Sequence, residues 1–510
     1  MISSGSYRLL KNTAALYFRM FINMSISLYI SRITLDILGV EDFGIYNVVG
    51  GIVILMTILT AAFSNCSQRF FSTALGKNSL PLLRKYFLTI LNVHLLMAVI
   101  FIILGEICAY WLIHHYLTIP IHRIDAASTV FHLSLVTSAF NLTTVPFIAL
   151  IMATENISFY AAISIIEQII KLALVLLLSK INGDLLIYYA LFLFGLSISI
   201  RLSYRLYCQH KFKEIVKYQF VIHKKELHEI WTFVSWSYLG NFSGILKEQG
   251  INIVIGHWFG VSVNAARGIS MQVFNAISAF GNNFIAALRP QITKSYAAGN
   301  IEKSIHLASV GTRMTFYLMF FLANVLFYEC PFILHLWLKE VPAYAIDFTR
   351  LITILSLLRI IQEPLVTLYL AVGNIKASQI ASAIYTIICI AICILIFSLG
   401  FSPIYSVYVS CLLELANYTT ALYLLHKLIP IKIGLFLKKT YFPILAIFLI
   451  SNSLLLLLRR FIEDAPLKSF FGTIIYTILV IPILIWLLGI TESEKDLIKQ
   501  IIRKKTTKNG

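Results

Sequence analysis

Apolar blocks of about twenty residues alternate with short polar connections along nearly the whole chain. A helix of that length crosses the roughly 30 Å hydrocarbon core of a bilayer. The pattern therefore predicts an all-α polytopic membrane protein with about fourteen transmembrane helices. The expected spans are residues 13–38, 43–67, 86–113, 126–152, 157–179, 185–207, 229–257, 264–288, 308–330, 348–372, 377–399, 404–426, 440–459 and 469–490.

Composition agrees with this interpretation. Hydrophobic residues make up 59% of the 510 residues and charged residues 13%, and the mean hydropathy of +0.84 leaves no room for a sizeable soluble domain. The net charge of +18 is spread over connections rather than gathered on one face, so we expect contact with membrane lipids and no nucleic-acid partner. The seven cysteines follow neither a metal-binding nor a disulfide spacing.

Lysine and arginine are concentrated in every second connection, as in proteins that keep their basic loops in the cytosol. This asymmetry places both termini in the cytosol. The opposite set of connections holds only Arg123, Lys180, Lys339, Arg459, Arg460 and Lys468.

A weak internal repeat with an offset of about 221 residues divides the chain. Leu38-Gly39-Val40 matches Phe259-Gly260-Val261, and a turn at residues 74–78 matches one at 297–300. We expect two pseudo-symmetric six-helix lobes with a cavity between them. The predicted parts are an N-terminal lobe (1–208), a cytosolic linker (209–228), a C-terminal lobe (229–428), two further spans (429–490) and a basic cytosolic tail (491–510). Residues 491–505 fit either an interfacial helix or a solvated tail.

Charged side chains inside spans are costly and therefore need partners or a function. Three pairs at i, i+4 can neutralise themselves on one helix face: Arg32–Asp36, Glu167–Lys171 and Arg359–Glu363. Five residues have no such partner: Arg19, Lys247, Glu248, Arg267 and Glu414. Arg19 can snorkel to the cytosolic edge, but Lys247 lies near mid-membrane, where snorkelling is difficult. Cations at the facing ends of the two repeats would form an anion-binding cavity.

The sequence resembles the Wzx-type polysaccharide flippases, which translocate O-antigen and capsule repeat units. Their superfamily also holds the lipid II flippase and the MATE drug exporters. The resemblance covers nearly the whole chain and is specific to the fold more than to the cargo. It rests on residues 28–46 (LYISRITLDILGVEDFGIY), 249–252 (QGIN), 264–268 (NAARG), 283–284 (NF), 290–297 (PQITKSYA) and 336–344 (LWLKEVPAY).

The resemblance implies alternating access of a cationic cavity in a bacterial inner membrane. The implied cargo is an undecaprenyl-diphosphate-linked glycan for O-antigen or capsule biosynthesis, with polysaccharide polymerase machinery as a candidate partner. Arg267, Arg32 and Asp36 lie within the matching motifs, and Lys247 and Glu248 lie beside one. In relatives, spans 13 and 14 are thought to flank a groove for the polyprenyl tail.

The resulting hypothesis gives the cations and the carboxylates separate roles. Arg32, Lys247 and Arg267, with Arg19 as a further candidate, would bind the diphosphate. Carboxylates in a low-dielectric setting exchange protons readily, so the candidate proton or sodium sites are Asp36, Glu248, Glu363 and Glu414. We expect no catalytic residue, metal or cofactor beyond such an ion gradient.

Rival classes are a cation-coupled drug exporter of the same superfamily and a membrane glycosyltransferase or polymerase. A drug exporter would be expected to carry acidic rather than basic cavity residues, and no large outer loop is present for an enzyme. A primary pump is disfavoured because the chain lacks a G-x-x-x-x-G-K-[ST] phosphate loop.

Overall fold

The computed structural model describes residues 4–111, 121–338, 341–460, 466–492 and 494–496. Within these ranges every regular element is a helix, which confirms the predicted all-α membrane fold. Ten helical segments in the described part are long and apolar enough to cross a membrane. The other four expected spans (43–67, 229–257, 264–288 and 404–426) are helical as well. The tail prediction for residues 491–505 falls mostly outside the described residues.

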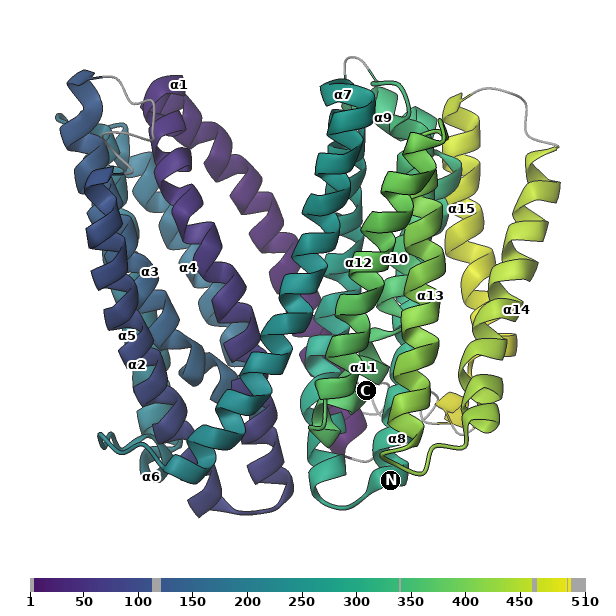
Figure 1. Cartoon of the computed structure of the whole chain (residues 1–510), viewed down its shortest axis with the longest axis horizontal. Coiled ribbons are helices and arrows are strands. Elements are labelled where there is room, and N and C mark those ends of the chain that lie inside the picture. Colours follow the sequence, from purple (N-terminus) through teal and green to yellow (C-terminus); the bar gives the residue numbers. More distant parts are fainter. Residues whose placement is uncertain (1–3, 112–120, 339–340, 461–465, 493, 497–510) are drawn as a thin grey trace, which may run out of the picture. The chain divides into compact units, whose positions relative to one another are not determined.

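The chain forms two compact units (Figure 1). The N unit comprises residues 10–238, and the C unit consists mainly of residues 239–510. The division falls inside one long helix, α7 (Lys224–Ala297). Its first turns pack with the N unit, where Tyr86 donates a 2.8 Å hydrogen bond to Glu229 and Lys85 lies 3.9 Å from Glu226.

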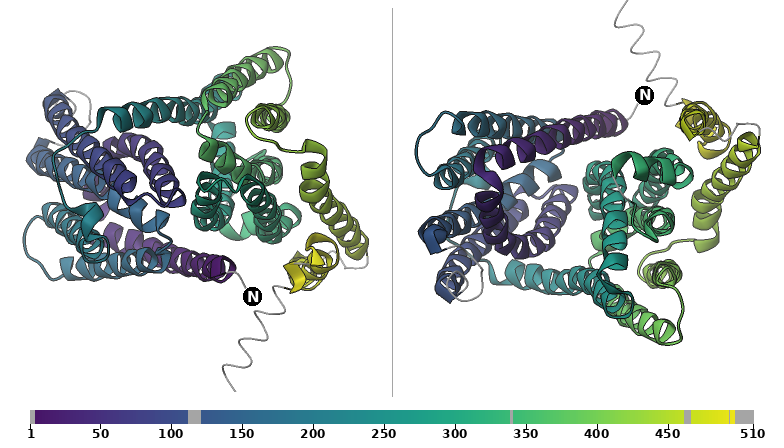
Figure 2. Two further views of the ribbon diagram at one scale, coloured as in Figure 1. Left: turned by 90° about the horizontal axis from the view of Figure 1, so that it is seen from below. Right: turned by 90° about the horizontal axis from the view of Figure 1, so that it is seen from above.

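The N unit is a bundle in which α3 packs between α2 and α5. Figure 2 shows its helices nearly end-on. Aromatic and aliphatic side chains fill its core, with Phe71, Phe87 and Leu150 fully buried. The elements are α1 (Ser4–Gly76), α2 (Leu80–Trp111), η2 (Ile121–Arg123), α3 (Ile124–Ala153), α4 (Ile157–Leu178), α5 (Leu185–Lys211) and α6 (Lys213–Val216).

The C unit contains the rest of α7 and the eight α-helices that follow it in the described residues. The expected span 348–372 is split by a turn at Ile361–Gln362. Pro364 accounts for the break, because it has no N–H to bond the carbonyl four residues earlier. The elements are α8 (Ile301–Tyr328), α9 (Cys330–Trp337), α10 (Ala345–Ile360), α11 (Glu363–Val372), α12 (Lys376–Ser398), α13 (Tyr405–His426), α14 (Ile433–Arg459), α15 (Pro466–Leu484) and η3 (Ile485–Gly489).

Matching kinks in α1 and α7 reproduce the internal repeat in three dimensions. Gly39 adopts φ 76°, ψ 170° and Gly260 adopts φ 80°, ψ −177°, a region open almost only to glycine. The two helices also end alike: Asn78 and Gly299 both have positive φ. The next amide in each case, from Ser79 and Asn300, bonds a carbonyl five residues back. Both the kinks and the helix ends are 221 residues apart.

The last two helices are fastened to α8 at two places. Arg313 donates to the Gly489 carbonyl (2.8 Å) and pairs with Glu494 (2.6 Å). Arg313 lies near the middle of α8, and just beyond the C-terminal end of that helix Glu329 accepts from Thr473 (2.6 Å) and pairs with Arg459 (2.9 Å). These contacts join α14, α15 and the residues that follow them to α8, and the buried charges of Arg313 and Glu329 thereby gain partners.

A second ionic cluster joins three connections of the N unit. Arg123 in η2 lies 2.6 Å from Asp42, which follows the α1 kink, and 2.7 Å from Asp184, the N-cap of α5. Partial burial alone would raise the pKa of Asp184. Hydrogen bonds from Arg123 and from the amides of Ile187 and Leu186 outweigh that effect and lower the pKa.

Replacing Gly260 with alanine should destabilise the protein, because a Cβ strains this backbone conformation even where space is open. We expect the free energy of unfolding to fall by about 1–3 kcal/mol. The matched control is Gly244→Ala, in a regular and open part of the same helix, which should be neutral or stabilising by about 0.5–1 kcal/mol. Thermal or denaturant unfolding in detergent measures both, and equal stability of the two variants would contradict the assignment.

Asp184 should make stability depend on pH in the acid range. Because its folded pKa is depressed, its contribution is present above the unfolded pKa of about 3.9 and is lost as the pH falls through the folded value. Asp184→Asn should therefore lower the melting temperature near pH 6 and converge with wild type at low pH. The exposed Asp125→Asn serves as the control. A difference between wild type and Asp184→Asn that does not change with pH would contradict the linkage.

Candidate functional site

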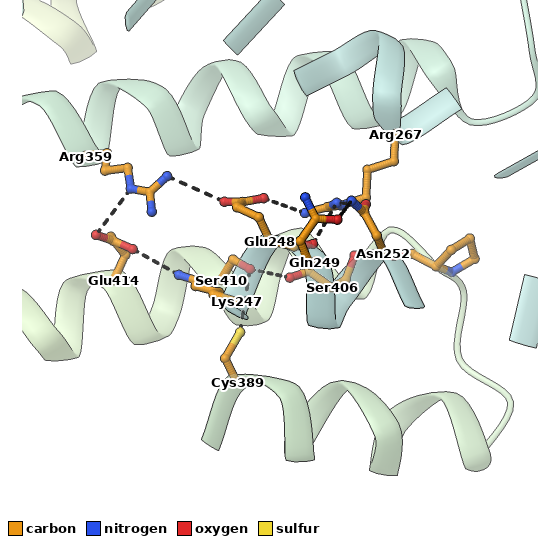
Figure 3. Close-up of polar contacts among 11 residues, drawn as sticks. Lys247, Glu248, Gln249, Asn252, Arg267, Arg359, Cys389, Ser406, Ser410 and Glu414 are labelled. Carbon is orange, nitrogen blue, oxygen red and sulfur yellow. Dashed lines mark hydrogen bonds and ion pairs between the residues drawn. The ribbon is translucent and has the colours of Figure 1, made fainter. Parts of the chain in front are cut away.

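Five charged side chains of the C unit meet in what we call the five-charge cluster: Lys247, Glu248, Arg267, Arg359 and Glu414 (Figure 3). They come from the two limbs of α7, from α10 and from α13. Lys247 lies thirteen residues before the Gly260 kink, hence about 20 Å along the helix from it. Lys247 and Glu248 therefore lie within the expected span 229–257, well away from the kink.

Two short ion pairs form the cluster's core. The Nζ atom of Lys247 lies 3.0 Å from Oε2 of Glu414. Nη2 of Arg267 lies 2.8 Å from Oε2 of Glu248. Lys247 and Glu248 are adjacent and so point in different directions, and each finds its partner on another limb or helix.

Arg359 connects the two pairs. Its Nη1 lies 3.5 Å from Oε1 of Glu248, and its Nε lies 3.9 Å from Oε1 of Glu414. The Arg359 side chain also lies over the ring of Phe274, 5.5 Å from the centroid. Each carboxylate thus has two cationic neighbours.

The kink of α7 explains why residues 15 to 19 positions apart meet. Arg267 hydrogen-bonds Asn252, and Nη1 also reaches the Glu248 carbonyl at 3.5 Å. The chain reverses direction at Gly260. Asn252 lies eight residues before this kink and Arg267 lies seven residues after it, so the two side chains lie at the same distance from the kink on the two limbs of α7. Asn252 and Glu248, four residues apart, share the face that meets Arg267.

The charges do not balance. Three positive and two negative side chains leave a formal charge of +1 on the five-charge cluster. Lys247 and Arg267 are only 8% and 4% exposed, whereas the side chains of Arg359 and Glu248 are 31% and 23% exposed, so the cluster is only partly shielded from its surroundings. Glu363 lies within electrostatic reach of Arg359 and Arg289, and adding both Glu363 and Arg289 keeps the excess at +1.

Small polar side chains lie beside the cluster (Figure 3). The Ser410 hydroxyl lies 3.7 Å from the Cys389 thiol, and either group can be the donor. The same hydroxyl donates a 2.8 Å hydrogen bond to the Ser406 carbonyl. In the described residues, no group of histidine, cysteine and carboxylate side chains has a metal-binding arrangement.

Four sequence-predicted site residues are thus brought together: Lys247, Glu248, Arg267 and Glu414. None has a same-face partner in the sequence pattern, and the structure supplies partners from other segments. The i, i+4 spacing predicts a pair of Arg359 with Glu363, yet the ion pairs of Arg359 are with Glu248 and Glu414. The break at Ile361–Gln362 accounts for this, because Arg359 and Glu363 do not belong to one continuous helix. Glu363 stays within electrostatic reach of Arg359.

The remaining predicted residues lie on α1 in the N unit. Arg19 donates a 2.8 Å hydrogen bond to the Tyr160 hydroxyl and lies over that ring at 4.9 Å. Arg32 and Asp36 have exposed side chains on the part of α1 that the structure describes. Their part in binding or coupling stays a prediction.

Comparison with known proteins agrees with this architecture. A family model described as MatE matches residues 239–395, which include Lys247, Glu248, Arg267 and Arg359. No curated protein sequence matches the chain.

Solved structures share the fold over 84% of the chain. The crystal structure of a MATE point mutant has a TM-score of 0.71 at 12% identity, covering 84% of this chain and 99% of that one. An outward-facing multidrug resistance MATE family transporter of the MOP superfamily has a TM-score of 0.71 at 12% identity, covering 84% of this chain and 98% of that one. A MOP superfamily transporter from Pyrococcus furiosus, described as having a binding pocket of reverse polarity, has a TM-score of 0.69 at 13% identity, covering 84% and 99%. The chain therefore has the fold of the MATE transporters of the MOP superfamily.

Breaking the Lys247–Glu414 pair should be strongly destabilising, because one charge would stay buried without its closest partner. We expect Lys247→Met to lower the free energy of unfolding by about 3 kcal/mol. The double variant Lys247→Met/Glu414→Leu should recover at least half of this loss, since two apolar side chains replace the pair. Unfolding in detergent measures the cycle, and additive losses in the double variant would show that the two residues do not interact.

Proposed function

We propose that the protein moves a lipid-linked, diphosphate-bearing oligosaccharide across the bacterial inner membrane by alternating access of its two lobes. The observation that carries the proposal is the excess positive charge of the five-charge cluster. A diphosphate is a compact anion, and arginine offers it paired N–H donors matched to phosphate oxygens. Support for transport comes from the MATE fold and from the MatE match.

In this mechanism the cargo competes with the carboxylates for the same cations. An incoming diphosphate takes Lys247, Arg267 and Arg359 away from Glu414 and Glu248. A carboxylate that loses its cation in a dry interior is neutralised by taking up a proton or binding sodium. Release of the cargo restores the ion pairs and expels that ion. Cargo binding and ion binding are thereby linked through Glu248 and Glu414, with Glu363 and Asp36 as further candidate coupling sites.

The proposed transport also defines the cargo, the partner and the orientation of the protein. The cargo is an undecaprenyl-diphosphate-linked repeat unit for O-antigen or capsule biosynthesis, and polysaccharide polymerase machinery would act on it after translocation. Both termini lie in the cytosol, and the protein performs no covalent step. Arg19 and Arg32 are further candidate cargo-binding residues.

A cation-coupled exporter of small molecules is the second candidate. The description of one structural neighbour favours it, since that protein is described as a multidrug resistance transporter. Under this alternative Glu248 and Glu414 would bind a cationic compound, and the neighbouring cations would have to move away. The Pyrococcus furiosus neighbour, described as having a pocket of reverse polarity suggesting a different function, illustrates that this fold is not tied to one cargo charge.

The decisive experiment uses a strain lacking this chain. We expect the surface glycan to be lost and complete lipid-linked repeat units to accumulate on the cytosolic leaflet. Lys247→Ala should fail to restore the glycan although the protein stays in the membrane, whereas the exposed Lys303→Ala should restore it fully. Intact glycan together with altered dye or drug efflux would assign the protein to the exporter class instead.

A charge swap tests the position of the cation in the same strain. Lys247→Glu/Glu414→Lys keeps an ion pair and the net charge while moving the cation to α13. If Lys247 contacts the cargo, the swap should lose more than nine-tenths of the glycan while the protein stays in the membrane, although a lysine at position 414 would face Arg359 and lower the stability. Full glycan with the swap would mean that the pair is only structural.

A further inference from the structure

The connection between α6 and α7 is an exposed segment of aromatic and basic side chains. Residues 217–223 are not helical, and Phe220, Tyr218 and Val221 are 77%, 51% and 41% exposed. On either side Lys213, Lys217, Lys224 and Lys225 are exposed as well, with Glu214 as the one exposed carboxylate between 213 and 225. Apolar side chains this exposed call for a partner.

The segment is fixed against α2 by its backbone. The side-chain amide of Asn92 donates 3.0 Å hydrogen bonds to the carbonyls of both Gln219 and Val221. The amide of His223 donates to the Thr89 hydroxyl at 3.3 Å. Because Asn92 is itself buried beneath the segment, the exposed side chains are held facing outward rather than left on a loose loop.

The place where residues 217–223 contact α2 indicates which part of the membrane surrounds them. One face of α2 exposes Leu96, Ile100, Ile103 and Ile107, an uncharged face suited to lipid tails. Asn92 and Thr89 continue that face by the helical i, i+3/i+4 spacing. Asn92 lies seven residues beyond Lys85, the last basic residue before the apolar stretch, so the segment lies about 10 Å from that charge. Lys85 marks the basic end of α2, so we expect the segment near the boundary between headgroups and acyl chains, where interfacial apolar side chains insert by about 5–10 Å.

We propose that residues 217–225 form an interfacial anchor that binds anionic phospholipids of the cytosolic leaflet. Phe220, Tyr218 and Val221 insert among the upper acyl chains. Lys217, Lys224 and Lys225 bind the headgroup phosphates, since basic side chains next to a membrane surface are drawn to its negative potential. The carbonyls of Gln219 and Val221 already accept hydrogen bonds from Asn92, so they do not depend on water at this depth.

Hydrogen exchange of the full-length protein in lipid nanodiscs tests the anchor. In phosphatidylglycerol nanodiscs the amides of 217–223 should exchange at least about tenfold more slowly than in phosphatidylcholine. The variant Lys217→Gln/Lys224→Gln/Lys225→Gln should weaken the interaction by about a hundredfold and remove the difference. Phe220→Ser should reduce protection in both lipids, because insertion of the ring does not require a charged headgroup.

The control removes the same charge elsewhere. Lys303→Gln/Lys438→Gln/Lys439→Gln changes three exposed lysines of the C unit and should leave the exchange of 217–223 unaltered. Melting temperatures of all variants verify folding. Equal exchange in the two lipids, or an equal effect of both triple variants, would overturn the proposal. Protection that appears only when cytosolic proteins are added would assign the segment to a protein partner instead.

Discussion

Every charge held inside the membrane must have a partner, and this constraint determines how the C unit is built. Burying an ion without compensation costs several kcal/mol, so Lys247, Glu248, Arg267 and Glu414 can be tolerated only together. Their partners come from α7, α10 and α13. The cluster therefore requires these helices to meet at one depth. The same requirement applies to Arg313 of α8 and to Glu329, which follows that helix; their partners lie in or next to the C-terminal pair of helices.

The kink at Gly260 satisfies this requirement without a loop. It lets one limb of α7 present Glu248 and Asn252 to Arg267 on the other limb. The N unit repeats the backbone at Gly39 but not the chemistry. An offset of 221 residues places Ile26, Ser27 and Tyr46 where the C unit has Lys247, Glu248 and Arg267. The repeat thus preserved the helix geometry, while these three charges have no counterpart in the N unit.

This difference explains what could be predicted from the sequence. The helical spans follow from hydropathy, and the charged residues of the site stand out because charge is rare in apolar blocks. Their pairing could not be predicted, since it joins residues up to 167 positions apart and depends on how helices rotate. The ion pairs of Arg359 with Glu248 and Glu414 could not be predicted for a local reason: the i, i+4 rule assumes a continuous helix, and Pro364 interrupts it, although Glu363 stays within electrostatic reach of Arg359. The ion pairs that join the C-terminal helices to α8 and Glu329 could not be predicted from the sequence pattern.

The residual charge decides what such a cluster can do. A fully neutral cluster would be a structural element, and an anion entering it would have to leave a carboxylate without a partner and gain nothing in return. With one cation in excess, the first negative charge of a ligand completes the balance, and only the further charge of a diphosphate displaces Glu248 or Glu414. Each carboxylate shares its cations through Arg359, so displacing one alters the field at the other. An anionic cargo and a coupling ion therefore bind to the same set of side chains, which links their binding without any conformational signal between distant sites.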